Sequence, residues 1–381
     1  MTNQHTIPFL DLDGMNKPIR RDIMREITKV IETNSFTLGE VVTQFEHSFA
    51  AYNGLDYCVG TSDGTMAIRL MLEAYNVRGG EVIIPANTFV ATAEAIIEAG
   101  ATPVLADIND LTWLMEAEDV EKVITPNTKA ILLVHMFGNV CHMDEFYTLA
   151  DLHNIPLLVD ACQAHGATWK GQRSYALADA AAFSFYPGKN LGAFGDAGAV
   201  VTSNKSVADK VRRLRHHGQD LKSVHSDIGT TGRLDAIQAA VLRVKLMYLD
   251  TWNLERSRVD RSYIRYLCGR DGFDTAVEYS HSNSANHLFP VIHQNHEMNP
   301  RGLMISRLNA ANIGYGIHYP IPIHLTPAFY RFFKATEDQP YGPGTFPNAE
   351  RLANSMISLP MYPSLTDSEV RYISEVLLGA K

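Results

Sequence analysis

Pro156-Leu-Leu-Val-Asp-Ala161 is the stretch that decides the fold class. It is a short run with apolar residues at consecutive positions, and Ile131-Leu-Leu-Val134 repeats the pattern upstream. Runs that are apolar on both faces are typical of strands in a parallel sheet that helices cover on each side. Similar short runs continue in both directions along the chain, and the predicted strands are 57–61, 81–85, 103–108, 130–135, 156–161, 181–185 and 199–202.

Segments with helical periodicity lie between these strands, at 65–74, 92–98, 144–153 and 207–215. Repeated strand–helix units with short connections predict an α/β fold, in which a large doubly wound domain surrounds a mostly parallel seven-stranded sheet.

The pattern changes after Gly232. Apolar residues then recur at helical spacing from Leu234 to Tyr248 and predict a long helix that runs on towards Leu267. The less regular remainder predicts a smaller C-terminal α/β domain with a strand within 287–293. We expect the large domain to cover residues 1–250, including an N-terminal segment with one amphipathic helix at 21–33, and the small domain to cover residues 251–381.

The composition excludes several classes of protein. Of the 381 residues, 46% are hydrophobic and 20% are charged, so the chain can bury a sizeable core and is not globally disordered. A formal net charge of −9 without a basic tract argues against nucleic acid as a partner. No apolar run approaches the roughly 20 residues that span a bilayer, and residues 1–10 lack the pattern of a signal peptide. We therefore expect a soluble, cytoplasmic protein with no membrane partner. Four scattered cysteines without CxxC spacing predict neither a disulfide framework nor a metal site.

A lysine with small and apolar neighbours is the first candidate for chemistry. Lys189 lies in Ser184-Phe-Tyr-Pro-Gly-Lys-Asn-Leu-Gly-Ala-Phe-Gly-Asp-Ala-Gly198 and is the only charged residue between Asp179 and Asp196. Partial desolvation would lower the pKa of its ammonium and leave more free amine to attack a carbonyl. An exposed loop lysine is the ordinary alternative, but the nearby glycines indicate a backbone that approaches another group closely.

An aspartate at the end of an apolar strand is the second candidate. Ligands of open α/β sheets bind at the carboxyl ends of strands, so Asp160 and Lys189 can face one cleft. A buried carboxylate needs a cationic partner. The protonated pyridine nitrogen of pyridoxal phosphate (PLP) would supply one, and an aspartate is its usual protein partner. For Asp160 alone, a salt bridge or a helix cap is an equal alternative.

Two weaker signals complete a pattern. Gly60-Thr-Ser-Asp-Gly-Thr65 places small residues at a strand-to-helix junction, where backbone N–H groups can bind a phosphate, although an ordinary helix cap explains Ser62 equally well. Phe89, in PANTFVAT at 85–92, could stack on a planar ring, although most aromatic residues at such positions belong to the core. Along the chain, a helix start, an aromatic residue, an aspartate and a lysine follow one another. These are the groups that PLP needs to bind its phosphate, clamp its ring, keep its nitrogen protonated and react with its aldehyde.

These motifs carry a resemblance to a known family. Together with GRLDAIQAAVLRVKL at 232–246 and LPMYPSLT at 359–366, they make the sequence similar to the DegT/DnrJ/StrS family of PLP-dependent sugar aminotransferases, of fold type I. The resemblance covers nearly the whole chain. VDACQAHGA at 159–167 and SFYPGKNLGAFGDAGAV at 184–200 are its most specific parts.

The resemblance implies roles for individual residues in cofactor binding. Lys189 would form the covalent link to the PLP aldehyde, and Asp160 would pair with the ring nitrogen. Gln163 would hydrogen-bond the ring hydroxyl, and Phe89 would stack on the ring. The phosphate would be held by Ser184 and by the backbone of Gly64 and Thr65.

The resemblance also implies partners. Family members are homodimers with shared active sites, in which an Asn before GRLDAIQAA contacts the phosphate of the neighbouring site; this chain has Thr231 there, which can still donate one hydrogen bond. We expect glutamate as amino donor and a nucleotide-linked keto-deoxysugar as acceptor, with a dTDP-3-keto-6-deoxyhexose aminated at C3. Tyr186, Tyr319 and His324 are candidate substrate contacts, with ordinary packing as the alternative.

Other functions remain open at this point. A C4-specific nucleotide-sugar aminotransferase and an inositol-ketone aminotransferase would use the same catalytic residues. A remote alternative is an α/β-hydrolase, because Gly60-Thr-Ser-Asp-Gly64 fits the nucleophile elbow with Ser62 as nucleophile. That reading leaves Lys189 and Asp160 without a role. A scaffold protein without activity would be expected to have lost the lysine, and this chain retains it.

Overall fold

The computed structural model describes residues 6–294, 300–335 and 341–379. Residues 1–5 lie outside this range. They belong to the segment 1–10, in which the sequence shows no signal-peptide pattern. One large sheet confirms all seven predicted strands. Its order is β1 (Tyr57–Thr61), β9 (Gly198–Thr202), β8 (Ala180–Ser184), β5 (Leu157–Asp160), β4 (Thr128–Val134), β2 (Glu81–Pro85) and β3 (Thr102–Ala106).

The sheet is mostly parallel, as predicted. Strands β3, β2, β4, β5 and β8 run in the same direction, and only β9 runs antiparallel to its neighbours β8 and β1. Strand β5 and residues 130–134 of β4 are buried, which is why their sequences read as continuous apolar runs.

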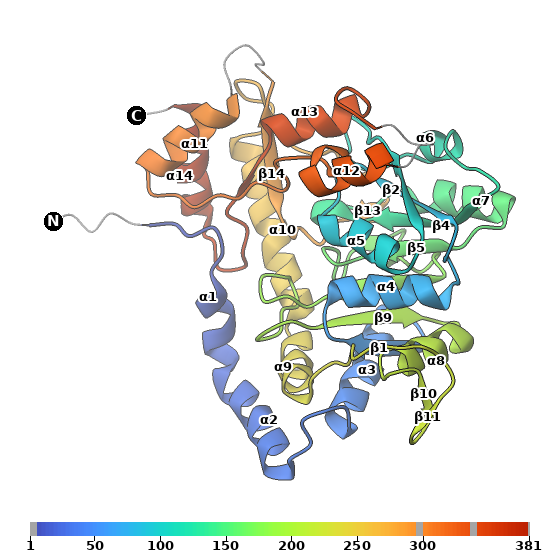
Figure 1. Ribbon diagram of the computed structural model, residues 1–381. Helices are drawn as coiled ribbons and strands as arrows, with labels where there is room; N and C mark the ends of the chain where they lie inside the picture. Colours follow the sequence, from blue (N-terminus) through green and yellow to red (C-terminus); the bar gives the residue numbers. More distant parts are fainter. Residues whose placement is uncertain (1–5, 295–299, 336–340, 380–381) are drawn as a thin grey trace.

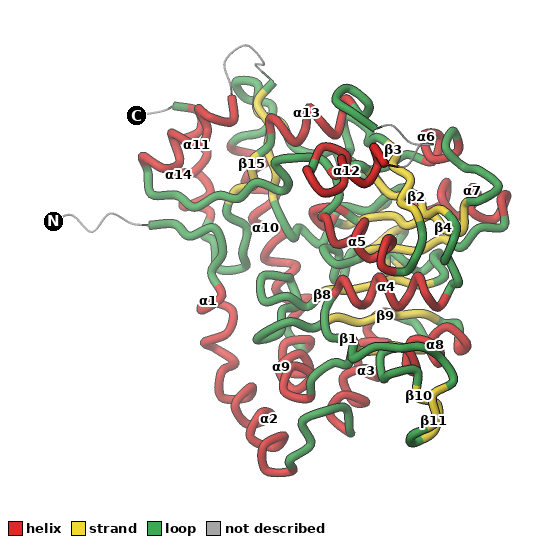
Figure 2. The backbone as a smooth tube through the Cα atoms, in the orientation of Figure 1, coloured by secondary structure: helices red, strands yellow, loops and turns green. Residues whose placement is uncertain are grey.

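Helices cover the sheet. Helices α4 (Gly64–Ala74) and α5 (Val90–Glu98) lie over one face (Figure 1), and Figure 2 shows the strands enclosed among helices. The other helices that pack on these strands or beside them are α3 (Glu40–Asn53), α6 (Ala117–Glu121), α7 (Met143–His153), α8 (Lys205–Leu214) and α9 (Ala236–Leu246). Short elements fill the connections: η2 (Met136–Gly138), β6 (Thr168–Trp169), β7 (Gln172–Arg173), β10 (Gln219–Leu221) and β11 (Val224–His225).

The long helix predicted from Leu234 towards Leu267 is in fact two helices. Helix α9 ends at Leu246, and α10 (Leu249–Tyr266) begins after a short break. At the break, the N–H groups of Met247 and Tyr248 bond to carbonyl groups three residues back, which tightens the last turn. The apolar spacing continues across the break, so sequence periodicity alone could not locate it.

The N-terminal segment also contains more than the single helix predicted. The predicted helix is present as α2 (Arg20–Thr33), but α1 (Leu12–Asn16) and η1 (Lys17–Ile19) precede it. Asp11 caps α1 by accepting a hydrogen bond from the backbone N–H of Gly14. A capped helix this short carries too little periodicity to be recognised in the sequence.

The C-terminal part has a sheet and core of its own. Strand β14 (Phe289–His293) pairs antiparallel with β12 (Phe273–Asp274) and β15 (Ile357–Leu359), and confirms the strand predicted within 287–293. The core beside it contains Val259, Phe289 and Leu377, and also Ile7 from the N-terminal segment. The remaining elements are β13 (Ser282–Asn283), α11 (Pro300–Ala310), η4 (Ile323–Leu325), α12 (Pro327–Ala335), α13 (Pro347–Ser355) and α14 (Asp367–Leu378).

The division into domains at residues 250 and 251 stays a prediction. Ile323, Phe333 and Phe346 of the C-terminal part pack into the core of the large sheet. Within the described residues, no helix is both long enough and apolar enough to cross a membrane.

The parallel strands determine where the site lies. Val134 at the end of β4 is in register with Asp160 at the end of β5, and β8 ends beside them at Ser184. The side chains of residues at the ends of these strands, or directly after them, therefore meet at one edge of the sheet.

Candidate active site

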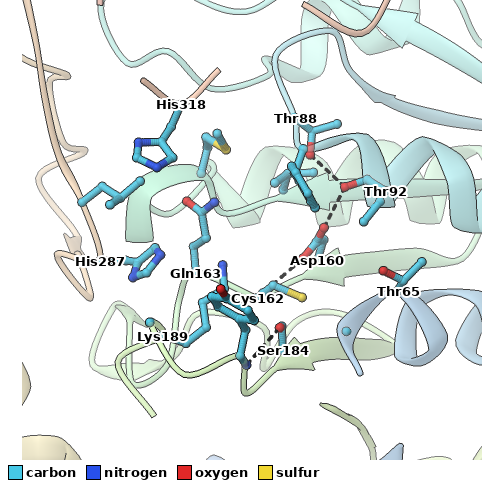
Figure 3. A pocket seen from close by; sticks show the side chains of 18 of the residues that line it. Thr65, Thr88, Thr92, Asp160, Cys162, Gln163, Ser184, Lys189, His287 and His318 are labelled. Atoms are coloured by element: carbon cyan, nitrogen blue, oxygen red, sulfur yellow. Dashed lines mark hydrogen bonds between the residues drawn. The ribbon is translucent and has the colours of Figure 1, made fainter. Parts of the chain in front are cut away.

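A cavity of about 440 Å³ opens at the carboxyl ends of these strands. Strand ends, the first turns of α4 and α5, and segments of the C-terminal part contribute its walls (Figure 3). The structure brings most of the candidate residues together here: Gly64, Thr65, Phe89, Asp160, Gln163, Ser184, Tyr186, Lys189 and Tyr319.

Lys189 lies in the loop that follows β8. Its backbone N–H donates to the carbonyl of Tyr186 at 2.8 Å, which turns the loop back on itself and places the side chain in the cavity. Burial lowers the pKa of the Lys189 ammonium, while the nearby Cys162 and Asp160 oppose that shift. A larger share of this amine is therefore uncharged than for a lysine in water.

Asp160 presents a carboxylate that neutral donors hold in place. Oδ2 accepts a 2.9 Å hydrogen bond from the hydroxyl of Thr92, and Oδ1 accepts a 3.1 Å bond from the backbone N–H of Cys162. Only 6% of the residue is exposed. No described side chain forms a direct ion pair with it, and Lys189, which lines the same cavity, acts on it only at longer range, so a cationic group of a ligand can still pair with this buried carboxylate.

The start of α4 lies directly against Ser184 at one wall of the cavity. Asp63 caps the helix by accepting a 2.8 Å bond from the N–H of Met66, which leaves the first N–H groups, those of Gly64 and Thr65, without a partner inside the helix. A Cβ at Gly64 would lie 2.6 Å from Cβ of Ser184, so only glycine allows this close approach. Free N–H groups and a nearby hydroxyl form a ready site for an anion.

Two aromatic rings and an amide complete the wall. The rings of Phe89 and Tyr319 lie 5.1 Å apart, and Phe89 keeps 49% of its surface exposed. The Gln163 side chain accepts a 2.6 Å hydrogen bond from the N–H of Phe137 and donates a longer one, 3.4 Å, to the hydroxyl of Tyr319. Gln163 is thereby fixed with its amide nitrogen towards the cavity.

Three candidates lie outside the cavity. His324 is fully buried, with Nε2 3.0 Å from a carboxylate oxygen of Glu350. Thr231 bonds to Nε2 of His217 at 2.9 Å. The hydroxyl of Ser62 donates to Oδ2 of Asp63, and no histidine of the described residues bonds to it, so the hydrolase alternative lacks the base that would activate this serine. His324 misses the cavity because its 3₁₀ turn directs the ring back onto α13.

Comparison with protein families identifies the chain. Residues 17–378 match the model of the DegT/DnrJ/EryC1/StrS aminotransferase family. The chain belongs to this family. The membership confirms the resemblance, the type I fold and the predicted aminotransferase activity, and with it PLP as the cofactor.

Individual members of the family are similar over most of their length. The dTDP-3-amino-3,4,6-trideoxy-alpha-D-glucose transaminase of Streptomyces venezuelae is 40% identical over 360 residues, which cover 94% of this chain and 92% of that protein. The crystal structure of DesV from S. venezuelae, in complex with a ketimine intermediate, has a TM-score of 0.92 at 39% identity and covers 99% of both chains. NtdA from Bacillus subtilis with bound cofactor PMP has a TM-score of 0.88 at 30% identity and covers 100% of this chain and 86% of NtdA.

Several cavity residues of this family member escaped the sequence analysis. The hydroxyl groups of Thr88 and Thr92 lie 2.8 Å apart, but Thr88 precedes α5, so helical spacing could not have paired the two residues in advance. His318 precedes Tyr319 directly, and its Nδ1 lies 2.9 Å from the hydroxyl of Ser358. His287 lies in a run that reads simply as a strand, so nothing local pointed to it.

Proposed function

We propose that this aminotransferase moves an amino group from glutamate to a nucleotide-linked 3-keto-deoxysugar, with amination at C3. The observation that carries this assignment is the placement of Lys189 and Asp160 in one cavity, because it brings together an amine of lowered pKa and a buried carboxylate that has no direct ion-pair partner. The amine of Lys189 would react with the aldehyde of PLP, and the carboxylate of Asp160 would pair with its ring nitrogen.

The described residues fit PLP in the remaining positions as well. The free N–H groups of Gly64 and Thr65, with Ser184 opposite, would hold the phosphate. Phe89 would stack on the ring, and the amide of Gln163 would donate to the ring hydroxyl. When bound, PLP supplies an electron sink for the bonds at the carbon that exchanges its amino group.

The chain itself supplies a base at the reacting carbon. Nζ of Lys189, uncharged more often because of its burial, can accept a proton and return it within the cavity. Thr92 and the backbone N–H of Cys162 hold the carboxylate of Asp160 in place, so it can stabilise positive charge on a group bound beside it. Tyr186 and Tyr319 line the same space and are the candidate substrate contacts.

The choice of substrate rests on the relatives. The S. venezuelae transaminase is named for a product that carries its amino group at C3 of a dTDP-linked sugar, and it shares 40% of its aligned residues with this chain. This supports C3 over C4 and a nucleotide sugar over an inositol ketone. Glutamate is proposed as the donor because the sequence resembles enzymes of this class.

We further propose a homodimer with shared active sites. Thr231 of the partner subunit would then contact the phosphate. The chain's Leu221, Val224 and Ile228 are largely exposed near the hairpin of β10 and β11, with Ile228 at 98%. Exposed apolar side chains gathered on a projecting segment favour burial against a second copy.

A spectrum and a substrate panel test this proposal. Purified protein reconstituted with PLP should show an absorption band that bleaches when glutamate is added, and a panel of nucleotide keto sugars should then restore the band with 3-keto substrates. Turnover of 4-keto sugars or inositol ketones alone would contradict the C3 assignment. A protein that takes up no PLP would contradict the whole proposal.

A further inference from the structure

A chain of amide hydrogen bonds connects the wall of the cavity to α10. Nδ2 of Asn253, on α10, donates to the carbonyl of His165 at 2.7 Å, so Oδ1 of Asn253 is left as the acceptor. That oxygen accepts a 2.9 Å hydrogen bond from Nδ2 of Asn190, which also donates to the carbonyl of Ala285 at 2.7 Å. Because a carbonyl can only accept, both amides have a fixed orientation.

The fixed amide of Asn190 determines the protonation of a cavity histidine. With Nδ2 of Asn190 committed to two acceptors, its Oδ1 faces Nδ1 of His287 at 3.1 Å. An amide oxygen accepts only, so Nδ1 of His287 must carry the proton. A neutral imidazole has one N–H, and Nε2 of His287 is therefore an unprotonated acceptor.

Nε2 of His287 is the ring nitrogen that is available to a ligand. His287 lines the cavity, and no described atom forms a hydrogen bond with its Nε2. Figure 3 shows the ring on the same side of the cavity as Gln163 and Lys189, below His318.

Burial, and secondly the charges around the ring, keep His287 neutral. Burial, reinforced by the positive charge of Lys189 and Arg256 and by His165 and His318, lowers the pKa of His287 well below 6.5. A histidine in this state cannot bind a carboxylate through Nε2, since the two lone pairs repel. It can accept a hydrogen bond from a hydroxyl group.

We propose that Nε2 of His287 accepts a hydrogen bond from a hydroxyl group of the keto sugar and so selects the sugar rather than the amino donor. This rests on the proposed function, because the cavity must be the one that receives the sugar. His287 is a substrate-binding residue in this account, and its action requires the Nδ1–H form that Asn190 and Asn253 impose.

The tautomer can be tested without cofactor or turnover. In the cofactor-free protein labelled with ¹⁵N-histidine, long-range ¹H–¹⁵N spectra should show one ring with a protonated Nδ1 and an unprotonated Nε2 throughout pH 6–8, and this signal should vanish in His287→Asn. A signal of the opposite tautomer, or one that titrates near pH 6.5, would overturn the proposal.

Two substitutions separate binding by Nε2 from a structural role. His287→Asn keeps a donor near Asn190 but removes the acceptor at the position of Nε2. The value of kcat/KM for the keto sugar should therefore fall by about 10- to 100-fold, the range expected when one buried polar group is left unpaired. Most of this loss should appear as a higher KM. His287→Gln can place an oxygen near the former Nε2 and should recover part of this loss. A structural role predicts the reverse order, with the Asn variant active and the Gln variant impaired.

The two half-reactions distinguish this proposal from the proposed function. Bleaching of the PLP band by glutamate should have the same rate in His287→Asn and in the unchanged protein. If both variants instead slow the glutamate half-reaction and leave the sugar half-reaction unchanged, the ring serves the amino donor and the proposal is wrong. If the unchanged protein shows no half-reaction with any donor, the proposed function fails, while the NMR result still stands on its own.

Discussion

The hydroxyl of Thr92, on α5, donates a 2.9 Å hydrogen bond to Oδ2 of Asp160 at the end of β5. A threonine hydroxyl has one hydrogen, so in the 2.8 Å contact between Thr88 and Thr92 the hydroxyl of Thr88 is the donor. Two hydroxyl groups thus form a short relay that orients the carboxylate from the opposite side to the N–H of Cys162.

Thr92→Val should weaken cofactor binding. Valine keeps the shape but removes the donor to a charged group, a bond worth about 1.5–3 kcal/mol, so the Kd for PLP should rise by about 10- to 100-fold in a titration of cofactor-free protein. Thr92→Ser keeps the hydroxyl and should bind nearly normally, and Thr88→Val should have a smaller effect. Unchanged affinity in Thr92→Val would show that Asp160 does not face the cofactor.

Phe89→Ala should affect binding and leave folding intact. The ring is half-exposed and contacts Tyr319, so its removal costs little core packing. Stacking between aromatic rings contributes about 0.5–1.5 kcal/mol, which corresponds to a rise of roughly 2- to 12-fold in the Kd for PLP. The thermal midpoint of the cofactor-free protein should stay the same. A lowered midpoint with normal affinity would assign Phe89 to packing instead.

Gly64→Ala should destabilise the protein through a steric clash. The new methyl group would lie 2.6 Å from Cβ of Ser184 and force α4 away from β8, at a cost of about 1–3 kcal/mol. Urea unfolding of the cofactor-free protein measures this loss. Gly342→Ala is the matched control, because a Cβ there meets nothing within 4 Å. Equal stability of the two variants would contradict the close approach of α4 to β8.

Acid should destabilise the protein through His135. Burial lowers the pKa of this residue from 6.5 to about 4, and a contact with the backbone of Ser174 only partly opposes the shift. The folded state binds fewer protons than the unfolded state between these pH values, so stability is lost as pH falls from 6.5 towards 4. His165, with a pKa lowered to about 3, acts in the same direction.

His135→Leu should flatten this pH dependence. Each pH unit is worth about 1.4 kcal/mol for one proton, so the variant should gain about 2 kcal/mol relative to the unchanged protein at pH 5, beyond any difference at pH 7. Urea unfolding at both pH values measures the change in slope. His153→Leu, at an exposed position on α7, serves as control. Parallel pH profiles for His135→Leu and the unchanged protein would rule out a buried neutral His135.

The sequence predicted the sheet and the centre of the site because both depend on local pattern. A strand buried on two faces reads as a continuous apolar run, and parallel strands bring their carboxyl ends together, so Asp160 and Lys189 could be assigned to one cleft before the structure was known.

The parts that were missed depend on contacts between distant segments. The acceptor state of His287 requires Asn190 in one loop and Asn253 on α10, an arrangement that no window of sequence contains. The position of His324 away from the cavity could not be foreseen, because its Pro-rich run gives no sign of which way a side chain in a 3₁₀ turn will point.

The covalent attachment of PLP is the central claim and can be measured directly. Protein reconstituted with PLP is reduced with borohydride, digested and analysed by mass spectrometry. The account predicts a phosphopyridoxyl group on the peptide that contains Lys189, and no turnover in Lys189→Ala. A label on a different lysine, or full activity in Lys189→Ala, would contradict it.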